Sequence, residues 1–166
     1  LLCIISEMLK APIQMPDGRM EYPTKGTPQG GILSPLLSNI VLNELDWWIT
    51  SQWELMPTKK QYKTRVTSSG VVERSSHYRA LRTSNLKEMF IVRYADDFKI
   101  FCKDYHTAKR TFIATEKWLQ ERLKLEISKE KSKIVNLKNN YSEFLGFKLK
   151  AMQKGNKYVV KSRVSN

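Results

Sequence analysis

Apolar residues recur at helical spacing in three stretches of the chain, and this periodicity predicts three helices. The predicted helices cover residues 1–9, residues 34–56 and residues 104–123. The second has the clearest start, because Ser34 is a suitable N-cap and Pro35 fits the first helical position. Asp104 or Thr107 can cap the third helix through a side-chain oxygen.

Strand-like apolar runs dominate the second half of the chain. Residues 90–94 and 98–102 form two such runs, separated only by Ala95-Asp96-Asp97, whose length and composition suit a tight hairpin. Further strands are predicted at residues 133–137, 142–150 and 157–161. This order of elements predicts an α+β fold, in which helices pack on one face of an antiparallel sheet.

Residues 58–88 are polar, basic and weakly periodic, which predicts a loop or a short hairpin insertion. The whole chain carries a net charge of +13, and residues 59–93 alone hold nine basic and two acidic side chains. A surplus this uneven favours a polyanionic partner, because Lys and Arg that neutralise phosphates release counterions. A generally solvated lysine-rich surface is the alternative. The basic residues expected to contact nucleic acid are Lys59, Lys60, Lys63, Arg65, Arg74, Arg79 and Arg82.

Composition excludes several other classes of protein. The sequence has no run of about 18 apolar residues, so we expect no membrane partner. Its two cysteines form no disulfide framework, and no Cys/His cluster has zinc spacing. These features favour a reducing compartment, the bacterial cytoplasm or an organelle. The chain lacks an initiator Met and opens in an apolar pattern, which indicates a fragment that starts inside a helix.

Two adjacent acids, Asp96 and Asp97, lie at the tip of the predicted apolar hairpin. Asp is common in turns, and a purely structural role is the alternative. Carboxylates on stiff strands nevertheless suit Mg²⁺, which accepts one or two carboxylates together with substrate phosphates. Two such ions can stabilise the attacking and leaving oxygens of an in-line displacement. Tyr94 would present a flat aromatic face beside this centre.

A glycine-containing loop precedes the second predicted helix. Gly30 and Gly31 permit close backbone approach to a ligand, and Gln29 offers an amide donor and acceptor beside them. A simple helix-entry turn would explain the same residues.

These elements resemble a known family. Residues 28–35 read PQGGILSP and resemble the reverse-transcriptase motif PQGxxxSP, while residues 94–97 read YADD and resemble its YxDD box. The longer strings at residues 26–46 and 93–98 are most similar to group II intron reverse transcriptases. Two later motifs follow in the expected order, at residues 123–133 and 144–147.

The resemblance implies roles for individual residues. Asp96 and Asp97 would hold the catalytic Mg²⁺ ions, and Lys131 would protonate the leaving pyrophosphate. The nucleotide pocket would be lined by Gln29, Gly30, Tyr94 and Ala95, of which the last two would touch the primer terminus. The primer grip would consist of Phe144, Leu145, Gly146 and Phe147.

The resemblance also implies a domain organisation and an activity. Residues 1–150 would be a partial reverse-transcriptase palm, and residues 151–166 the start of the thumb or a connection. The family's third carboxylate is missing, because Asp17, Asp46 and Asp104 all lie outside the expected strand context. The isolated chain is therefore expected to be inactive.

The expected parent is an RNA-directed DNA polymerase of a group II intron, which adds deoxynucleotides to a DNA primer on an RNA template and also assists intron RNA splicing as a maturase. One alternative is an RNA-binding module without polymerase activity. Another is a retron or CRISPR-associated reverse transcriptase. The oligomeric state stays open, with a homodimer among the arrangements.

Overall fold

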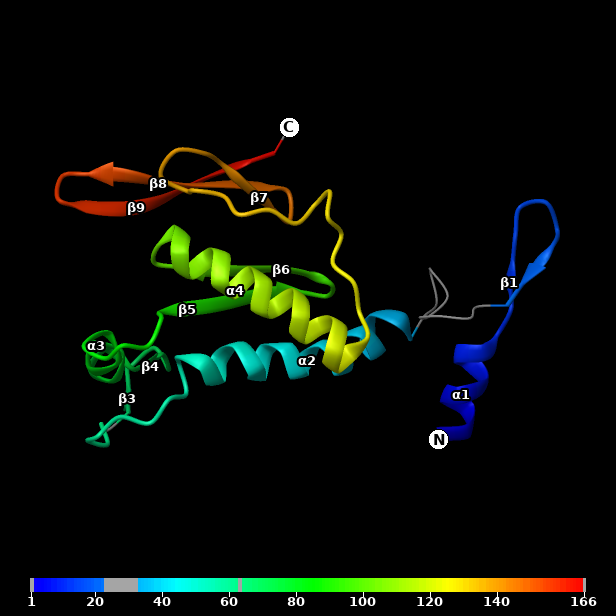
Figure 1. Ribbon diagram of the computed structural model, residues 1–166, viewed down its shortest axis with the longest axis horizontal. Helices are drawn as coiled ribbons and strands as arrows, with labels where there is room; N and C mark the ends of the chain where they lie inside the picture. The colour runs from blue at the N-terminus through cyan, green and yellow to red at the C-terminus, as the bar shows by residue number, and fades with distance from the viewer. Residues whose placement is uncertain (1, 23–32, 63, 166) are drawn as a thin grey trace.

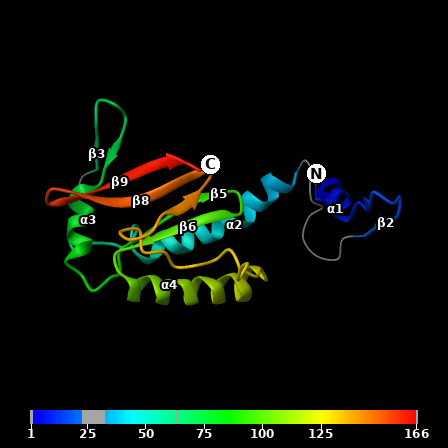
Figure 2. The same cartoon turned by 90° about the horizontal axis from the view of Figure 1, so that it is seen from above.

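The computed structural model describes residues 2–22, 33–62 and 64–165. The N-terminal part consists of one helix and a small hairpin, which lie apart from the other elements in both views (Figures 1 and 2). These elements are α1 (Leu2–Lys10), β1 (Ile13–Gln14) and β2 (Met20–Glu21). The helix confirms the first prediction, although none of its residues is buried.

The central part is built on a long helix and a hairpin. The elements are α2 (Ser34–Gln52), β5 (Met89–Tyr94), β6 (Asp97–Cys102), α4 (Tyr105–Trp118) and the π-helical turn η1 (Leu119–Leu123). The hairpin and both helices agree with the predictions, except that α2 ends at Gln52, four residues before its predicted end. Asp104 is the N-cap of α4, and its carboxylate accepts a hydrogen bond from the Thr107 amide at 2.8 Å. In α2 the cap position falls on Leu33, one residue before the predicted Ser34.

Both helices cover the same face of the β5–β6 hairpin. Arg93 of β5 bonds Asp46 of α2, and Cys102 of β6 lies within hydrogen-bond range of Thr111 of α4. The two helices also touch each other through the stacked rings of Trp48 and Trp118, whose centroids are 5.1 Å apart. Figure 2 shows α4 running alongside the hairpin. The expected packing of helices on one face is therefore present at this hairpin.

The hydrophobic core lies where α2, β5 and the segment between them meet. Trp53 is completely buried, stacks on Tyr78 at 5.2 Å and meets Phe90 edge-on at 5.1 Å. Leu45 and Ile49 of α2 are buried beside it. This aromatic and aliphatic cluster fixes the end of the hairpin opposite to the turn.

Residues 58–88 contain more structure than the sequence predicted. A small hairpin forms as expected, but a helix that was not predicted follows it. The elements are β3 (Arg65–Val66), β4 (Val72–Glu73) and α3 (Ser75–Arg82). This helix is only eight residues long and mostly polar, so its few apolar positions do not stand out in the sequence.

A three-stranded antiparallel sheet closes the chain. It has the order β7-β8-β9 and lies above the β5–β6 hairpin in Figure 1. The strands are β7 (Ser142–Phe144), β8 (Phe147–Lys154) and β9 (Lys157–Val164). β8 runs through residue 150, so the sheet is continuous across the predicted domain boundary.

Two expectations about the strands are wrong. Residues 133–137 form no strand, because this segment meets β8 through only one backbone bond, from the Ala151 amide to the Leu137 carbonyl. The described strands also form four small antiparallel sheets instead of one. The broader expectation of an α+β fold with antiparallel pairing is confirmed.

Candidate active site

The two adjacent acids lie on a two-residue turn. Tyr94 pairs with Asp97, so Ala95 and Asp96 are the central residues of the turn between β5 and β6. Ala95 has φ of 52°, a left-handed conformation that is uncommon for a residue with a side chain. Asp96 and Asp97 are both exposed, and neither makes a hydrogen bond or ion pair with any described residue. Both carboxylates are therefore available to a ligand.

Arg93 anchors this turn to α2. Its Nε lies 3.0 Å from each carboxylate oxygen of Asp46, and its Nη2 donates to Asp46 Oδ2 at 2.7 Å. Its Nη1 donates to the Asn39 side-chain oxygen and to the Ala95 carbonyl, both at 2.7 Å. One guanidinium thus holds the turn backbone and two positions of α2 together.

The guanidinium at the centre of this network is largely buried. The Arg93 side chain is only 11% exposed and that of Asp46 is 30% exposed. Charge-assisted, fork-shaped Arg–carboxylate contacts are strong and geometrically specific when water is largely excluded. The left-handed backbone conformation of Ala95 is thus stabilised by Arg93, which donates a hydrogen bond to the Ala95 carbonyl.

Lys99 connects the strand that carries Asp97 to the C-terminal sheet. Its Nζ donates to the Ser142 hydroxyl at 2.7 Å and lies 5.6 Å from the centre of the Phe144 ring. Burial lowers the pKa of Lys99, an effect opposed by the charge of Asp97 and reinforced by that of Lys133. A half-buried ammonium therefore lies between the acidic turn and β7.

The predicted primer-grip residues form a second two-residue turn. Leu145 and Gly146 have φ of 50° and 75°, the signs that a type I′ hairpin turn requires. Phe144 is half-buried, whereas Phe147 is 50% exposed. Through Lys99, this hairpin and the strand of the acidic turn are held against each other.

The other predicted residues stand apart from this arrangement. Lys131 is exposed in a turn and makes no hydrogen bond or ion pair with a described residue, so nothing in its contacts separates a catalytic from a solvated role. Tyr94 is 65% exposed beside the turn. Gln29, Gly30 and Lys63 lie outside the described residues.

No further carboxylate completes the pair within the described parts of the chain. Asp17 pairs with Arg19, Asp46 is held by Arg93, and Asp104 caps α4 at the far end of β6. Among the described residues, no cluster of three His, Cys, Asp or Glu side chains could hold a metal ion. Two unpaired carboxylates nevertheless fit the oxygen ligands of a hard cation that shares its shell with substrate phosphates.

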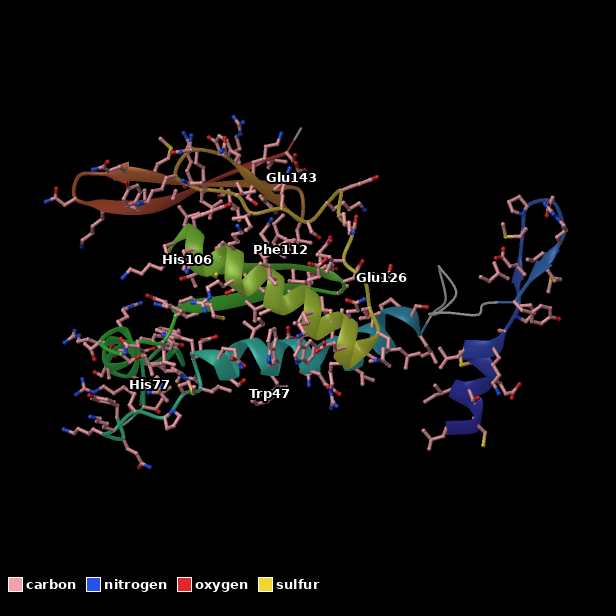
Figure 3. All side chains as sticks on the ribbon, viewed as in Figure 1. Trp47, His77, His106, Phe112, Glu126 and Glu143 are labelled. Atoms are coloured by element: carbon pink, nitrogen blue, oxygen red, sulfur yellow. The ribbon has the colours of Figure 1, made fainter. Side chains whose placement is uncertain are left out.

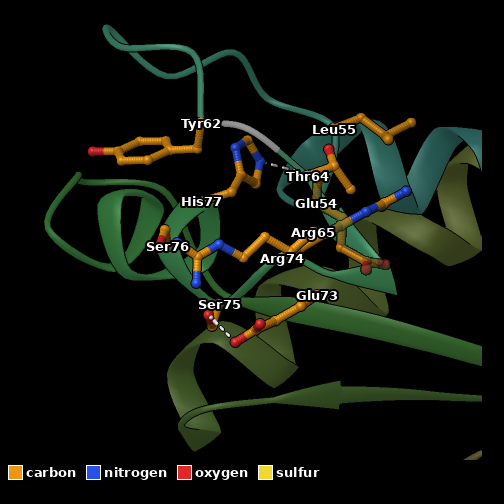
Figure 4. A pocket seen from close by; sticks show the side chains of 10 residues that line it. All are labelled: Glu54, Leu55, Tyr62, Thr64, Arg65, Glu73, Arg74, Ser75, Ser76 and His77. Carbon is orange, nitrogen blue, oxygen red and sulfur yellow. Dashed lines mark hydrogen bonds between the residues drawn. The ribbon is translucent and has the colours of Figure 1, made fainter. Parts of the chain in front are cut away.

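The insertion presents its basic residues in a mixed setting. Arg65 and Arg74 line a cavity of about 560 Å³ together with Glu54 and Glu73, so the lining is close to neutral (Figure 4). Glu54 accepts a hydrogen bond from Tyr78 Oη at 2.8 Å; the pKa of Tyr78 is raised by burial first and by this acid second.

The remaining predicted basic residues of the insertion differ in their availability. Arg82 is bound by both carboxylate oxygens of Glu88. Lys59, Lys60 and Arg79 are exposed. The net charge of +7 on residues 59–93 therefore overstates the number of basic side chains that are free to meet phosphates.

Sequence reasoning missed Arg93 and Lys99 as contributors to the site. A signal existed for both, because each is a charged residue inside an otherwise apolar strand and within three residues of the acidic pair. Their partners could not be inferred, since Asp46 and Ser142 lie 47 and 43 residues away in sequence.

Comparison with known proteins agrees with the motifs. The family described as reverse transcriptase (RNA-dependent DNA polymerase) matches residues 2–149. Protein YkfC of Escherichia coli is 31% identical over 136 residues, covering 80% of this chain and 34% of that protein. Group II intron-encoded protein LtrA of Lactococcus lactis is 30% identical over 161 residues, covering 78% of this chain and 26% of that protein.

A yeast protein is similar as well. The putative COX1/OXI3 intron 2 protein of Saccharomyces cerevisiae is 27% identical over 169 residues, covering 89% of this chain and 20% of that protein. The chain thus spans about a third or less of the length of these relatives. No described helix is both long and apolar enough to cross a membrane. The motifs, the family match over residues 2–149 and the similarity to group II intron-encoded proteins together establish that the chain belongs to the reverse transcriptase family.

Proposed function

We propose that the chain is most of the palm of a group II intron-encoded reverse transcriptase. Residues 1–150 form this partial palm, and residues 151–166 begin the thumb or a connection to it. The whole protein adds deoxynucleotides to a DNA primer on an RNA template. In the same protein, binding of intron RNA assists splicing, the maturase role.

The observation that carries this proposal is the acidic turn. Asp96 and Asp97 are exposed, unpaired among the described residues, and fixed in place through Arg93. The family uses divalent metal ions, and Mg²⁺ is the cation that fits a carboxylate pair near phosphates. When bound, the metal supplies charge stabilisation for the oxygens of an in-line phosphoryl transfer. Asp96 and Asp97 hold it, and Arg93 keeps the turn from shifting.

The other residues have supporting roles in this proposal. Tyr94 and Ala95 contact the primer terminus, and Gln29 and Gly30 line the nucleotide pocket. Phe144, Leu145, Gly146 and Phe147 hold the primer strand, and Lys131 protonates the pyrophosphate. The contact from Lys99 to Ser142 supports this assignment, because it links the acidic strand and the primer-grip hairpin.

An RNA-binding module without polymerase activity is the competing function. Such a module gains nothing from two adjacent carboxylates near phosphates, since like charges repel the ligand. Arg93, Asp46 and Asn39 form a hydrogen-bonded network that holds this turn in place, and this favours the polymerase.

Replacement of one carboxylate tests the proposal. Asp96→Asn in the full-length protein should abolish primer extension on an RNA template and leave RNA affinity within about twofold, because Lys and Arg supply the phosphate contacts. Asp17→Asn is the matched control, since it removes an exposed carboxylate from a distant turn. Equal losses of extension and RNA binding in Asp96→Asn would instead indicate a purely structural role for the turn.

The isolated chain offers a second test. It should fold, because its motifs lie on regular elements around a shared core, yet show no processive synthesis and only weak Mg²⁺ binding. Robust extension by the chain alone would contradict this expectation, because it would mean that the metal site is complete without a carboxylate from outside the chain.

A further inference from the structure

The C-terminal sheet gathers basic side chains on one of its faces. In β8 these residues occupy even positions and in β9 odd positions, and the antiparallel register pairs even with odd. They therefore project from the same side of the sheet. The residues are Lys148, Lys150, Lys154, Lys157, Lys161 and Arg163, which we call the outer basic face.

This face points away from the rest of the molecule. The opposite face carries Ser142, which is buried and receives the hydrogen bond from Lys99 of β6. Ser142 pairs with Leu149, so both lie on the side toward the β5–β6 hairpin. In Figure 3, nitrogen-tipped side chains project from the upper side of the sheet, away from α4.

The basic side chains face one another directly across the two strands. Lys148 is opposite Arg163, Lys150 is opposite Lys161, and Lys154 is opposite Lys157. Like charges in directly opposed positions destabilise an antiparallel pair. Three such pairs within one hairpin are therefore a cost to the isolated fold, and a counter-charge would remove it.

Nothing in the described part of the chain supplies enough counter-charge. None of the six side chains makes an ion pair with a described acid, and Glu143 of β7, labelled in Figure 3, is the one acid that the register places next to them. Arg163 and Lys150 instead lie over the Tyr141 ring, at 4.3 and 5.4 Å from its centre.

We propose that the outer basic face binds the phosphate backbone of an RNA. The inference rests on the proposed function, in which the protein works on RNA, and it adds a surface that the motifs do not include. The first and last basic positions of β8 are six residues apart, about 20 Å at the rise of a β-strand, so the charges form a linear array suited to a polyanionic strand. The Tyr141 ring holds two of these cations, Arg163 and Lys150, in place on this face.

The composition of the face argues against the other classes of partner. Protein interfaces are depleted in lysine, whereas five of the six basic residues here are lysine. A lipid surface takes a broad apolar face, but Met152 and Val159 are the two apolar residues that β8 and β9 place among these charges.

Salt-dependent RNA binding by the full-length protein tests the proposal. The variant carries Lys150→Gln, Lys161→Gln and Arg163→Gln, and the probe is a single-stranded RNA oligonucleotide. Three lost phosphate contacts should flatten the plot of log affinity against log salt by about two units. Between 1 M and 0.1 M salt, the ratio of the RNA affinities of the unchanged protein and the variant should therefore change by about 100-fold.

The matched control neutralises Lys103→Gln, Lys109→Gln and Arg110→Gln. These three residues are exposed, just after β6 and on α4. Their substitution removes three positive charges, as in the test variant, but on the α4 side of the β5–β6 hairpin. The control slope should stay within about half a unit of that of the unchanged protein. Equal slopes in the two variants would overturn the proposal. Loss of binding to phosphatidylserine vesicles with unchanged RNA binding would also overturn it, in favour of a membrane.

A second measurement uses the unchanged protein and avoids any effect of substitution on folding. RNA should protect Lys157 and Lys161 from acetylation several-fold more than it protects Lys109, and equal protection would contradict the proposal. The outcome is separable from the proposed function: if Asp96→Asn abolishes extension while the outer basic face shows no protection, only the present inference fails.

Discussion

The two long hairpins of the chain, β5–β6 and β8–β9, have the same topology but very different surroundings. One face of β5–β6 is covered by α2 and α4, and its charged residue Arg93 is satisfied by four hydrogen-bonding groups. Every residue of β9 is exposed, and its basic residues face other basic residues across the strand pair. The charge of Arg93 in the first hairpin is matched within this chain, whereas the basic residues of the second hairpin have no acidic ion-pair partner among the described residues.

The contrast shows how a charge can serve either the fold or a partner. Arg93 is nearly buried and its role is internal, because it holds the turn that carries Asp96. Lys161 has no such contact with a described residue and lies opposite Lys150, so its placement only lowers the stability of the hairpin unless a polyanion is bound. Removing the charge of Arg93 should therefore lower the free energy of unfolding, whereas removing a like-charged contact in β8–β9 should raise it.

The largest expected effect compares burial in the two regions. Ile49→Ala in α2 should lower the free energy of unfolding by about 2–5 kcal/mol, because Ile49 is 1% exposed in the core that includes Met89 of β5. Val160→Ala in β9 should change it by less than about 0.5 kcal/mol, since Val160 is 75% exposed. Urea unfolding measures both, and equal losses would mean that β9 is covered in solution.

The second prediction concerns the anchor of the acidic turn. Arg93→Met should lower the free energy of unfolding by about 1–3 kcal/mol, because it leaves the partly buried carboxylate of Asp46 without its partner. Primer extension should fall with it, as the Ala95 carbonyl is released. A double-mutant cycle with Asp46→Asn should be clearly less than additive. Full additivity would show that the two side chains act independently.

A smaller effect of the opposite sign is expected in the second hairpin. Lys161→Glu places an acid opposite Lys150 and should raise the free energy of unfolding by about 0.2–1 kcal/mol. RNA affinity should fall in the same variant. Lys109→Glu, with the same change of charge on α4, should leave RNA affinity nearly unchanged. Destabilisation by Lys161→Glu would argue that the like-charged pairs carry no cost.

The smallest expected effect is a pH dependence confined to the first region. Hydrogen bonds from the backbone and side chain of Thr107 lower the pKa of Asp104 below its ordinary value. A depressed carboxyl pKa contributes stability above the unfolded value of about 3.9, and this contribution is lost as pH falls through the lower folded value.

Helical circular dichroism and thermal unfolding between pH 2 and pH 6 measure this effect. Asp104→Asn should show a shallower decline on the acidic side, because Asn also caps helices but does not titrate. Identical profiles for the two proteins would assign the acid sensitivity to other carboxyls.

Local signals account for the parts of the fold that were predicted correctly. The β5–β6 hairpin was recognisable from two apolar runs around Ala95-Asp96-Asp97, and α4 from its periodicity and its Asp104 cap. Residues 133–137 were wrongly assigned to a strand, because an apolar run does not reveal whether a partner strand pairs with it. The roles of Asp96, Asp97, Lys131 and the primer-grip residues stay predictions.

The sequence by itself determined the motifs, the positions of the adjacent acids and the alternation of charge within each strand. In β8 the basic residues fall on even positions and in β9 on odd ones, and this parity is visible without any structure. Only the tertiary structure decided that the even positions of β8 and the odd positions of β9 lie on the same face of the sheet. The two-residue turn at Gly155 and Asn156 pairs Lys154 with Lys157, whereas a register shifted by one residue would send the β9 charges to the other side. In the same way, only packing brought Arg93 to Asp46, because the contact joins two elements that no local pattern connects.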